Sequence, residues 1–428
     1  MTPLERDEPR CLYVATARRA VPAPPLRTDA RTEVVVVGAG YTGLSTALHL
    51  AERGVAVTLL EAHEPGWGAA GRNGGQVNAG LKHEPDEAER DLGDVYGPRL
   101  VRLAGEAPAY LFGLITRLGI DCEARRLGTL RVAHHPRHAA ELRHSVEQWR
   151  RRGVALESWD GARVAAATGS DHYVAATFDP RGGAVNPLGL ARGLAAAAIT
   201  AGVTLCSESC ALKLERDGDG WRVATPGATV RADKVVLATD GYTDDLWGGL
   251  RTSIVPVYSS IIATEPLPPG LAASILPGGE VVYESGDVTT YYRRDREGRL
   301  LMGGRGAQRR VEEQQDYAHL SRHALRLWPG LAGVKWTHWW NGQFALTPDF
   351  YPRLHVPAPN LFIGLGYSGR GVALGTALGA QLADAAAGAP LETLALPVTG
   401  VPQIPFHRLW RVGVTARVAY GRLRDRLA

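Results

Sequence analysis

The 428-residue sequence predicts an α/β fold in which a parallel-sheet unit, assembled from discontinuous segments, carries an inserted antiparallel β-rich unit of the α+β type. Three observations predict this organisation. Four consecutive valines at 34–37 form an apolar run that is typical of a strand buried on both faces of a parallel sheet. Two further runs of this kind occur far along the chain, at 234–239 and 360–366. Between them, residues 253–304 contain short strand-like stretches separated by proline and glycine turns.

Residues 34–62 contain all the parts of a βαβ unit that binds a dinucleotide. Gly38 allows the tight turn after the strand, Gly40 leaves room for a pyrophosphate, and Gly43 lets helix and strand pack closely. The N-terminus of the helix offers N–H groups and the positive end of its dipole to the phosphates. Glu61 can accept hydrogen bonds from the hydroxyls of an adenosine ribose. The motif therefore predicts a Rossmann-like nucleotide site, but it does not distinguish NAD from FAD.

The composition narrows the classes of function. Hydrophobic residues make up 45% and charged residues 21% of the sequence, as in an ordinary globular protein. The net charge is +4, and the arginines are interleaved with acids, so we expect no nucleic-acid partner. The four cysteines are scattered, which favours reduced thiols and no metal site. No signal segment and no long apolar run are seen, so we expect a cytoplasmic protein that does not contact a membrane.

The remaining elements follow in chain order. An extended arm containing the sequence PAPP precedes the first strand. Helical patterns and strand patterns then alternate irregularly, which differs from a simple series of βα units. The predicted helices cover residues 85–118, 136–153, 189–201, 310–328 and 372–387, and the predicted strands cover 127–132, 203–206, 210–215, 221–225 and 228–232.

From these elements we predict a nucleotide-binding domain and a cap that binds substrate. The nucleotide-binding domain is expected to comprise residues 30–82, 155–250 and 336–390, and the cap residues 83–154 and 251–335. Residues 1–29 form an N-terminal arm, and residues 391–428 form a basic tail. In the tail a rough helical stripe of apolar residues is expected to dock on the protein's own core, with contact to a membrane or partner as the alternative. The stripe consists of Phe406, Leu409, Tyr420, Leu423 and Leu427.

Several segments together resemble one family. They are YVATA at 13–17, the glycine motif and its helix at 34–54, GRNGGQV at 71–77, ATDGYTDDL at 238–246, ATEPL at 263–267, GYSGRGV at 366–372, and IPFHRLWR and YGRLRDRL in the tail. The sequence resembles the D-amino-acid oxidase and glycine oxidase superfamily of FAD-dependent oxidoreductases, and within it the γ-glutamylputrescine oxidase branch. The resemblance implies FAD as cofactor. It also implies hydride transfer from the carbon beside an amine nitrogen to flavin N5, after which the imine hydrolyses.

The motifs and the resemblance together give a set of residues expected to bind FAD. Arg72 can carry a phosphate charge, although a plain surface arginine is the alternative. The helix that begins near Val372 directs its positive end toward the flavin ring, although a turn without a chemical role is the alternative. The full set is Gly38, Gly40, Tyr41, Thr42, Gly43, Glu61, Ala62, Gly71, Arg72, Asn73, Gly74, Gly75, Gln76, Ala211, Thr239, Gly241, Gly342, Gly366, Ser368, Gly369, Arg370, Gly371 and Val372.

On the substrate side we expect Tyr367, Trp340 and Tyr292 to contact the substrate. Tyr291 and Tyr292 are neighbours on a strand and must face opposite sides, so at most one of them can face the site. Packing in the core is the alternative for the tryptophans at 336, 339 and 340. His338 lies within this aromatic run, and we expect it to pack there without a catalytic role.

The sequence departs from relatives in the superfamily at three places. Relatives that bind the flavin covalently carry a cysteine close to this place, but residues 342–346, directly before Thr347, contain none, so we expect non-covalent FAD. In relatives the strand at 299–305 carries a lysine that speeds the reaction with oxygen. Here it carries Leu300 to Met302, so the electron acceptor can be O2 or another compound. Ala373 replaces a lysine that binds a carboxylate, which favours a γ-glutamylated polyamine or another secondary amine over a small amino acid.

Other functions remain as alternatives. They are oxidation of glycine or D-amino acids, aromatic hydroxylation suggested by Asp240-Gly241, and an FAD-binding subunit without catalysis of its own. The serine and arginine expected after an aromatic hydroxylase Asp-Gly motif are absent, because Tyr242 to Leu246 follow. The sequence does not predict the oligomeric state.

Overall fold

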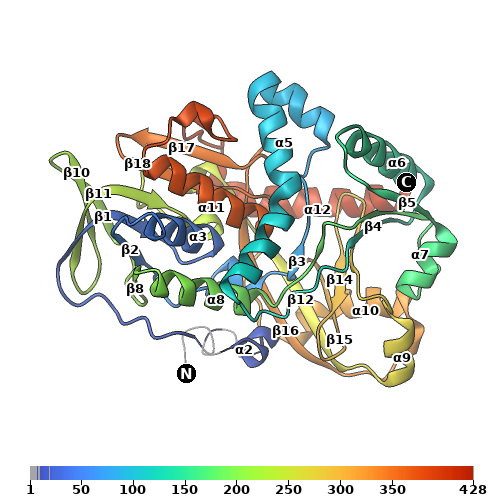
Figure 1. Cartoon of the computed structure of the whole chain (residues 1–428). Coiled ribbons are helices and arrows are strands. Elements are labelled where there is room, and N and C mark those ends of the chain that lie inside the picture. The colour runs from blue at the N-terminus through green and yellow to red at the C-terminus, as the bar shows by residue number, and fades with distance from the viewer. Residues whose placement is uncertain (1–6, 8–9, 19, 428) are drawn as a thin grey trace.

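The computed structural model describes Asp7, residues 10–18 and residues 20–427, and its elements form two units, each built on its own sheet (Figure 1). The first sheet has the order β19-β17-β18-β11-β1-β2-β8, with the hairpin β9-β10 attached to β11. Strands β18, β11, β1, β2 and β8 are parallel to one another. The bounds are β1 (Ala30–Val37), β2 (Val57–Leu60), β8 (Thr204–Cys206), β9 (Lys213–Asp217), β10 (Gly220–Ala224), β11 (Thr229–Leu237), β17 (Arg353–Ala358), β18 (Leu361–Leu365) and β19 (Val398–Thr399).

Four helices pack with this sheet on one side. They are α3 (Tyr41–Ala51), α5 (Pro85–Leu118), α8 (Pro187–Thr200) and α11 (Ala373–Ala386). Strand β1 is buried on both faces: Val34 and Val36 belong to the core under the helices, whereas Val35 and Val37 belong to the core on the other side. Burial on both faces is the reason why the valine run has no polar alternation.

The second sheet has the order β16-β12-β15-β14-β13-β4-β6-β5 and is antiparallel except for the parallel pair β13 and β4. Its strands are β4 (Thr129–Ala133), β5 (Glu157–Asp160), β6 (Ala175–Asp179), β12 (Val255–Pro266), β13 (Val281–Glu284), β14 (Tyr291–Arg294), β15 (Arg299–Arg305) and β16 (Trp336–Leu346). The other elements are α2 (Leu12–Thr16), α4 (Ala69–Arg72), α6 (Pro136–Arg151), α7 (Gly161–Thr168), α9 (Pro269–Ser274), α10 (Ala318–Leu327), α12 (Trp410–Leu427), β3 (Gln76–Val77) and β7 (Gly183–Ala184).

Small residues bring α3 unusually close to its neighbours. A Cβ atom on Gly43 would lie 1.9 Å from the carbonyl oxygen of Gly38, and one on Gly379 would lie 2.5 Å from the carbonyl oxygen of Thr42. Two hydroxyls of α3 use this proximity: Ser45 donates to the carbonyl of Thr376 at 2.8 Å, and Thr46 donates to that of Gly379 at 2.9 Å. The close packing fixes the N-termini of α3 and α11 at the same edge of the sheet.

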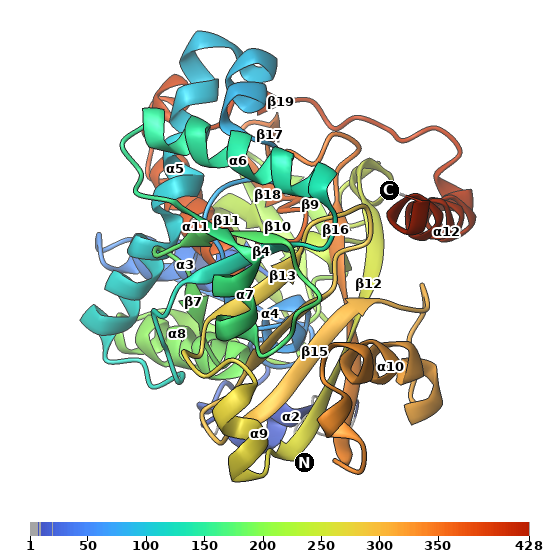
Figure 2. The same ribbon diagram turned by 90° about the vertical axis from the view of Figure 1, so that its right-hand side faces the viewer.

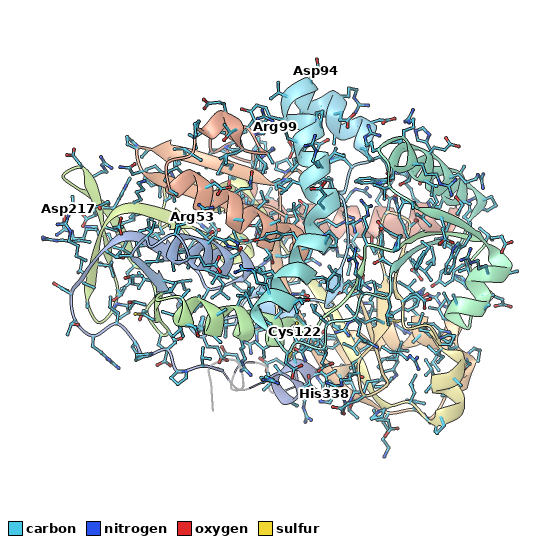
Figure 3. The ribbon with its side chains drawn as sticks, viewed as in Figure 1. Arg53, Asp94, Arg99, Cys122, Asp217 and His338 are labelled. Atoms are coloured by element: carbon cyan, nitrogen blue, oxygen red, sulfur yellow. The ribbon has the colours of Figure 1, made fainter. Side chains whose placement is uncertain are left out.

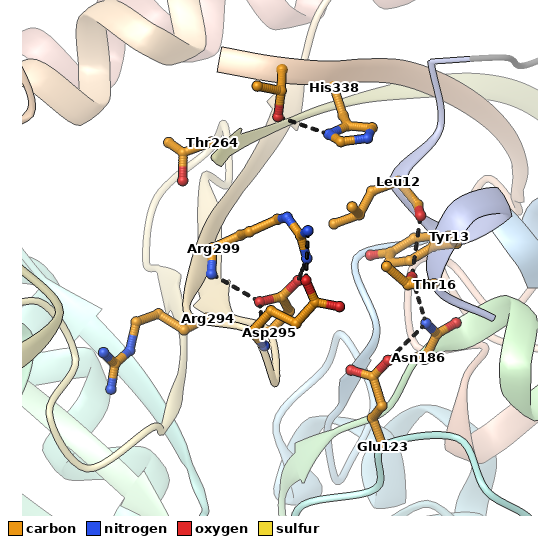
Figure 4. Close-up of polar contacts among 12 residues, drawn as sticks. Leu12, Tyr13, Thr16, Glu123, Asn186, Thr264, Arg294, Asp295, Arg299 and His338 are labelled. Atoms are coloured by element: carbon orange, nitrogen blue, oxygen red, sulfur yellow. Dashed lines mark hydrogen bonds and ion pairs between the residues drawn. The ribbon is translucent and has the colours of Figure 1, made fainter. Parts of the chain in front are cut away.

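The N-terminal arm is tied to the body of the protein through α8 (Figure 4). Asn186 caps α8 by accepting a hydrogen bond from the N–H of Gly189 at 3.0 Å, and its amide donates to the Thr16 hydroxyl at 2.9 Å. Thr16 in turn donates to the carbonyl of Leu12 at 3.1 Å. The segment YVATA is thus part of a helix turn docked on the fold.

Several ion pairs between exposed side chains lie on the surface of this unit. Arg53 at the end of α3 pairs with Asp384 of α11, and Asp217 at the tip of the β9-β10 hairpin pairs with Arg231 at 3.2 Å (Figure 3). Cys122, which follows α5, is buried instead. Exposed ion pairs contribute little to stability, so the packing of small residues holds α3 and α11 together.

The structure corrects several predicted boundaries. Residues 228–232 and 234–239 form one strand, β11, because the first half pairs with β10 and the second half with β18 while both pair with β1. The helix predicted at 310–328 begins only at Ala318, since the side chain of Tyr317 bonds back to the carbonyl of Val311 at 2.9 Å. Strands β5, β6 and β16 pair within the second sheet, although the predicted boundaries put them in the nucleotide-binding domain.

The C-terminal tail was expected to dock on the core of the protein, and it does not. It forms α12, which lies at the side of the molecule beyond a long extended connection (Figure 2). Phe406, Leu409 and Tyr420 are 78%, 54% and 56% exposed, so these members of the stripe do not pack on the core. The side chains of Leu423 and Leu427 lie outside the described residues.

Two ion pairs attach α12 to the second unit. Asp287 accepts from Arg417 at 2.8 Å and from Arg424 at 3.3 Å. Within the described chain, none of the helices is both long and apolar enough to cross a bilayer.

The contact between α3 and β1 can be tested with two glycine substitutions. Gly43→Ala forces its methyl group against the backbone of Gly38, so we expect the free energy of unfolding to fall by about 3 kcal/mol. Gly113→Ala is the matched control, because this glycine of α5 has no atom within 4 Å of the added Cβ, and alanine in a helix gains up to about 1 kcal/mol. Urea denaturation of both variants measures the difference. Equal stability of the two variants would show that the close contact is unimportant.

Candidate functional site

A cavity of about 580 Å³ lies between the two units and receives residues from both. Val37, Leu60 and Ala238 line it from the carboxyl ends of the parallel strands, which is the edge where open α/β sheets bind ligands. Tyr283 and Tyr291 line it from the second sheet. The cavity therefore joins the predicted nucleotide site to the second sheet.

The glycine turn at one end of the cavity has the geometry expected for a pyrophosphate. Gly38 adopts a φ of +102°, and a Cβ there would lie 2.8 Å from the carbonyl oxygen of Ala238. At Gly40 the nearest atom to an added Cβ is 3.9 Å away, so the wall is open at this point. Gly40 stands at the N-cap of α3 and has no side chain to cap it, which leaves the first N–H groups of that helix to a ligand.

Glu61 lies at the end of β2 and shapes the same turn. Its carboxylate accepts hydrogen bonds from the N–H of Ala39 at 2.7 Å and of His63 at 3.0 Å. Burial raises the pKa of Glu61, and these N–H groups counter the rise. A carboxylate next to an open glycine turn and an uncapped helix is the set of groups that the adenosine half of FAD requires, so the residues present fit this cofactor.

The segment after α4 forms the next part of the wall. The Arg72 guanidinium lies over the ring of Trp67, with Cζ at 4.3 Å from the centroid. The indole of Trp340 donates to the carbonyl of Arg72 at 3.0 Å. Gly342 provides room for Arg72, because a Cβ on Gly342 would lie 3.0 Å from Arg72 Cβ. Trp340 thus positions the backbone of Arg72 from behind.

Asp240, which follows β11, joins three strand ends in another part of the wall. Its carboxylate accepts from the N–H of Gly366 at 2.9 Å and from that of Ala345 at 3.4 Å. Asp240 itself has a φ of +39°, which is rare for a residue other than glycine. Burial raises the pKa of Asp240, and the backbone N–H groups counter this. The Asp-Gly pair therefore holds the glycine loop before α11 in place.

Tyr367 lines the cavity, as predicted by its place beside the last glycine loop. Its hydroxyl is 2.6 Å from Oγ1 of Thr42 at the start of α3, and burial raises the pKa of Tyr367. Whether Tyr367 contacts the substrate stays a prediction.

The other two residues expected to contact substrate do not line the cavity. Trp340 is fully buried and packs against Tyr13. Tyr292 is also buried, and its hydroxyl donates to that of Tyr173 at 3.0 Å on the far side of the sheet. Tyr291 and Tyr292 face opposite sides of the strand, as expected, but the one that faces the cavity is Tyr291. Tyr291 therefore replaces Tyr292 as the candidate.

Most of the residues expected to bind FAD do line the cavity. They are Gly38, Gly40, Tyr41, Thr42, Glu61, Ala62, Arg72, Asn73, Gly74, Gln76, Ala211, Thr239, Gly241, Gly342, Ser368, Gly369, Arg370, Gly371 and Val372.

Four of the expected glycines lie behind the cavity wall. Gly43 serves the packing of α3, and a Cβ on Gly71 would lie 2.2 Å from the carbonyl oxygen of Gly66. Gly75 and Gly366 have φ angles of +68° and +82°. These glycines are required by the backbone, not by direct contact with a ligand.

The sequence analysis missed several cavity residues. His63 and Trp67 stack with ring centroids 3.8 Å apart near Glu61. Lys82, Arg131 and Arg305 line the cavity from three separate segments.

His338 and one cluster of possible metal ligands lie outside the cavity. His338 bonds to Thr337 at 2.8 Å and is not among the cavity residues (Figure 4). In the described part of the chain, His83, Glu87 and Asp91 lie close enough together to hold a metal ion. Both ring nitrogens of His83 already have protein partners, Glu87 at 3.1 Å and the carbonyl of Asp349 at 2.6 Å, so this group is explained as a helix-end contact.

Comparison with known proteins supports an FAD-binding site in this cavity. Residues 33–385 match the family DAO, described as FAD dependent oxidoreductase. The chain is 34% identical to the probable oxidoreductase OrdL of Rhizobium meliloti, over 97% of each chain. It is also 34% identical to the γ-glutamylputrescine oxidoreductase of Escherichia coli, over 97% of this chain and 98% of the relative.

Among solved structures, the glycine oxidase of Geobacillus kaustophilus has the same fold, with a TM-score of 0.71 and 24% identity over 83% of this chain and 94% of that one. The family match covers both the nucleotide turn and the second sheet, so the cavity is the site of an FAD enzyme. The chain belongs to the DAO family of FAD-dependent oxidoreductases.

Proposed function

We propose that this protein oxidises an amine at the carbon beside its nitrogen, with a γ-glutamylated polyamine or another secondary amine as the favoured substrate. The observation that carries the proposal is the single cavity that contains both the FAD-binding turn and an aromatic wall from the second sheet. A substrate on that wall would lie in the same enclosed space as the cofactor, which is what direct transfer requires.

The relatives support this choice of substrate. The Escherichia coli relative is named for γ-glutamylputrescine and is similar over nearly its whole length. Ala373, the first residue of α11, offers no charge for a small carboxylate substrate. An elongated amine fits better with a cavity that extends between two units.

The protein's own residues would bind and orient the amine. FAD, when bound, supplies the hydride acceptor, and O2 or another acceptor then takes the electrons. Tyr291 stands between Gly74 and Gly303, since a Cβ on either glycine would lie 2.5 Å or 2.2 Å from its ring. This narrow slot fixes the ring as a flat wall for the substrate. Its hydroxyl shares a hydrogen bond of 3.0 Å with Ser259, which holds the ring in place.

The N-terminus of α11 would stabilise negative charge that FAD gains when it accepts the hydride. Val372 precedes the helix and provides no side-chain cap, so the first N–H groups point their partial positive charge into the cavity region. Tyr367 and Thr42 tie this end of the cavity to α3. The imine product needs only water to give the carbonyl compound, so no side-chain base is required for that step.

An anaerobic screen of amines tests the proposed function. We expect γ-glutamylputrescine or an N-alkylated amine to bleach the flavin absorbance of the holoenzyme, whereas glycine and D-alanine do so weakly or not at all. Admitting air afterwards decides between O2 and another acceptor. Bleaching by D-amino acids alone would contradict the choice of substrate, and no bleaching by any amine would favour a non-catalytic FAD protein.

The neighbouring tyrosines provide a matched pair of variants. Tyr291→Phe removes a hydroxyl from the cavity wall, so we expect kcat/KM to fall about fivefold, the effect of one hydrogen bond of about 1 kcal/mol. Tyr292→Phe removes a hydroxyl on the far side of the sheet, so it lowers the free energy of unfolding by about 1 kcal/mol and leaves kcat/KM unchanged. The reverse pattern in steady-state kinetics and urea denaturation would put Tyr292 at the substrate.

We expect the FAD to be released intact when the protein is denatured with acid. Cys210 is the cysteine that lines the cavity, and it lies next to Ala211 where the charge of Glu61 acts on it, at the adenosine end. The loop at 366–372 and the segment at 342–346 contain no cysteine that could bond the flavin ring. Yellow colour that stays with the precipitated protein would show a covalent link.

A further inference from the structure

The C-terminal helix α12 is held against the second unit at both of its ends. Just before the helix, Nε2 of His407 lies 2.7 Å from the carbonyl oxygen of Ile254, which directly precedes β12. Toward its end, Arg417 and Arg424 pair with Asp287, in the loop between β13 and β14. Because both anchors belong to the second unit, they fix which face of the helix points outward.

One face of α12 rests on the surface of the protein. Trp410, Val414 and Val418 are half-buried, and Gly421 is buried. A Cβ on Gly421 would lie 2.9 Å from the Cβ of Asp287, so the helix comes very close to this loop. Residues spaced by three or four positions share one side of a helix, so these four define the inner face of α12.

A second apolar stripe lies on the outward side of the tail. It begins in the turn before α12 and continues along the helix at intervals of three and four residues. We call it the outer stripe, and it consists of the exposed residues Phe406, Leu409, Val412, Ala416 and Tyr420. Val412 in its middle is 68% exposed. Figure 2 shows α12 at the edge of the molecule, so the outer stripe is open to a partner that approaches from outside.

The polar residues beside the outer stripe are basic. Arg411 precedes one stripe residue and Arg417 follows another, and since successive residues of a helix turn by about 100°, these arginines lie on opposite sides of the stripe. Arg408 lies in the turn before the helix. From residue 406 onward the sequence contains six arginines and one acid. The outward face of the tail therefore combines exposed apolar groups with an excess of positive charge.

This combination fits a lipid surface that carries negative charge. A helix with apolar and aromatic residues on one face and arginines beside them lies in the headgroup layer of a bilayer, with its apolar face buried. The ring of a tyrosine such as Tyr420 is favourable at this depth, because it has an apolar body and a polar tip. Since none of the helices of the described chain is both long and apolar enough to cross a bilayer, α12 would lie on the surface.

A second copy of the chain suits this face less well. A stable dimer interface comprises about 20–30 residues on each side, whereas the outer stripe supplies only a short line of apolar side chains. Two copies of the tail would also bring their arginines together, and like charges across an interface are unfavourable. The charge of the tail thus selects an anionic partner.

We propose that the outward face of α12 and of the turn before it is a docking surface for a membrane that contains anionic lipids. The outer stripe enters the headgroup layer, and Arg408, Arg411 and Arg417 contact the lipid phosphates. The sequence leaves contact with a membrane or a partner as the alternative for this tail, and the exposed stripe favours it. The assignment does not depend on the amine oxidation proposed above.

Docking in this way would place one part of the cavity wall close to the membrane. Ser285 and Thr289, on either side of Asp287 in the sequence, line the cavity. The inner face of α12 rests on this loop, and the outer stripe faces away from it. The loop would therefore lie about one helix diameter, roughly 10–12 Å, from the headgroups.

Flotation with lipid vesicles tests the docking surface, using the full-length protein with FAD bound. We expect the protein to float with vesicles of phosphatidylcholine and phosphatidylglycerol, and to stay behind when the vesicles contain phosphatidylcholine alone. Raising the salt from about 0.1 M to about 1 M shortens the Debye length from about 10 Å to about 3 Å, so it should release most of the bound protein. Equal binding to both kinds of vesicle, or no binding to either, would overturn the proposal.

Charge variants assign the attraction to the tail. Arg408→Gln combined with Arg411→Gln should weaken binding to the anionic vesicles about thirtyfold, because each basic residue near such a surface contributes about fivefold. Arg27→Gln combined with Arg102→Gln is the matched control, since both arginines are exposed, lie outside the tail and change the net charge by the same amount. Equal weakening by the two pairs would show a general attraction of a basic protein and contradict the assignment.

A pair of apolar substitutions tests the outer stripe itself. Leu409→Ser combined with Val412→Ser should weaken vesicle binding at least about tenfold, because less apolar surface enters the headgroup layer. Val95→Ser combined with Leu325→Ser is the control, since these exposed residues lie on α5 and α10, and it should leave binding unchanged. Unchanged binding of the stripe variant would overturn the proposal.

Sedimentation without lipid tests the competing occupant. We expect the wild type and the variant with Leu409→Ser and Val412→Ser to sediment as the same species and to keep the same flavin absorbance, because both changed side chains are exposed. A wild-type dimer that this variant converts into a monomer would assign the outer stripe to a second copy and overturn the membrane assignment.

Discussion

The close approach of α3 to β1 is the contact on which the rest of the site depends. Gly38 and Gly43 have no side chains to keep the helix away, so the first turn of α3 meets the end of the strand. Gly379 then lets α11 pack directly on α3, and the hydroxyls of Ser45 and Thr46 bond to its backbone. Two helix N-termini are thereby aimed at one sheet edge, where a dinucleotide can use both.

Buried carboxylates organise the two ends of that edge. Glu61 holds the N–H groups of Ala39 and His63, and Asp240 holds those of Gly366 and Ala345. Each carboxylate replaces water with backbone donors, which is how a buried acid keeps a polar turn in shape. The glycine loops at both ends of the cofactor site are therefore fixed by the protein before any ligand binds.

The second sheet gives the cavity a different chemistry from the first. Its alternation sends Tyr291 and Tyr283 toward the cavity, while Tyr292 packs into the core behind. Basic groups from both units meet around Tyr283. The first unit supplies backbone N–H donors and carboxylates, and the second supplies flat rings and arginines, so the two walls of the cavity differ in chemistry.

Local sequence determined the nucleotide turn and the parallel strands, because their spacing encodes strand, turn and helix directly, and the resemblance to a family added most of the other residues expected in the cofactor wall. It also determined that Tyr291 and Tyr292 face opposite ways, since the pleat has a period of two. Only the tertiary structure decided which tyrosine faces the cavity, that β16 joins the second sheet, and that Phe406 and Leu409 remain exposed. It alone brought Lys82, Arg131, Arg305 and Arg370 together. The physical reason is that which face of a strand is buried, and which distant charges meet, depend on contacts between segments that no local pattern contains.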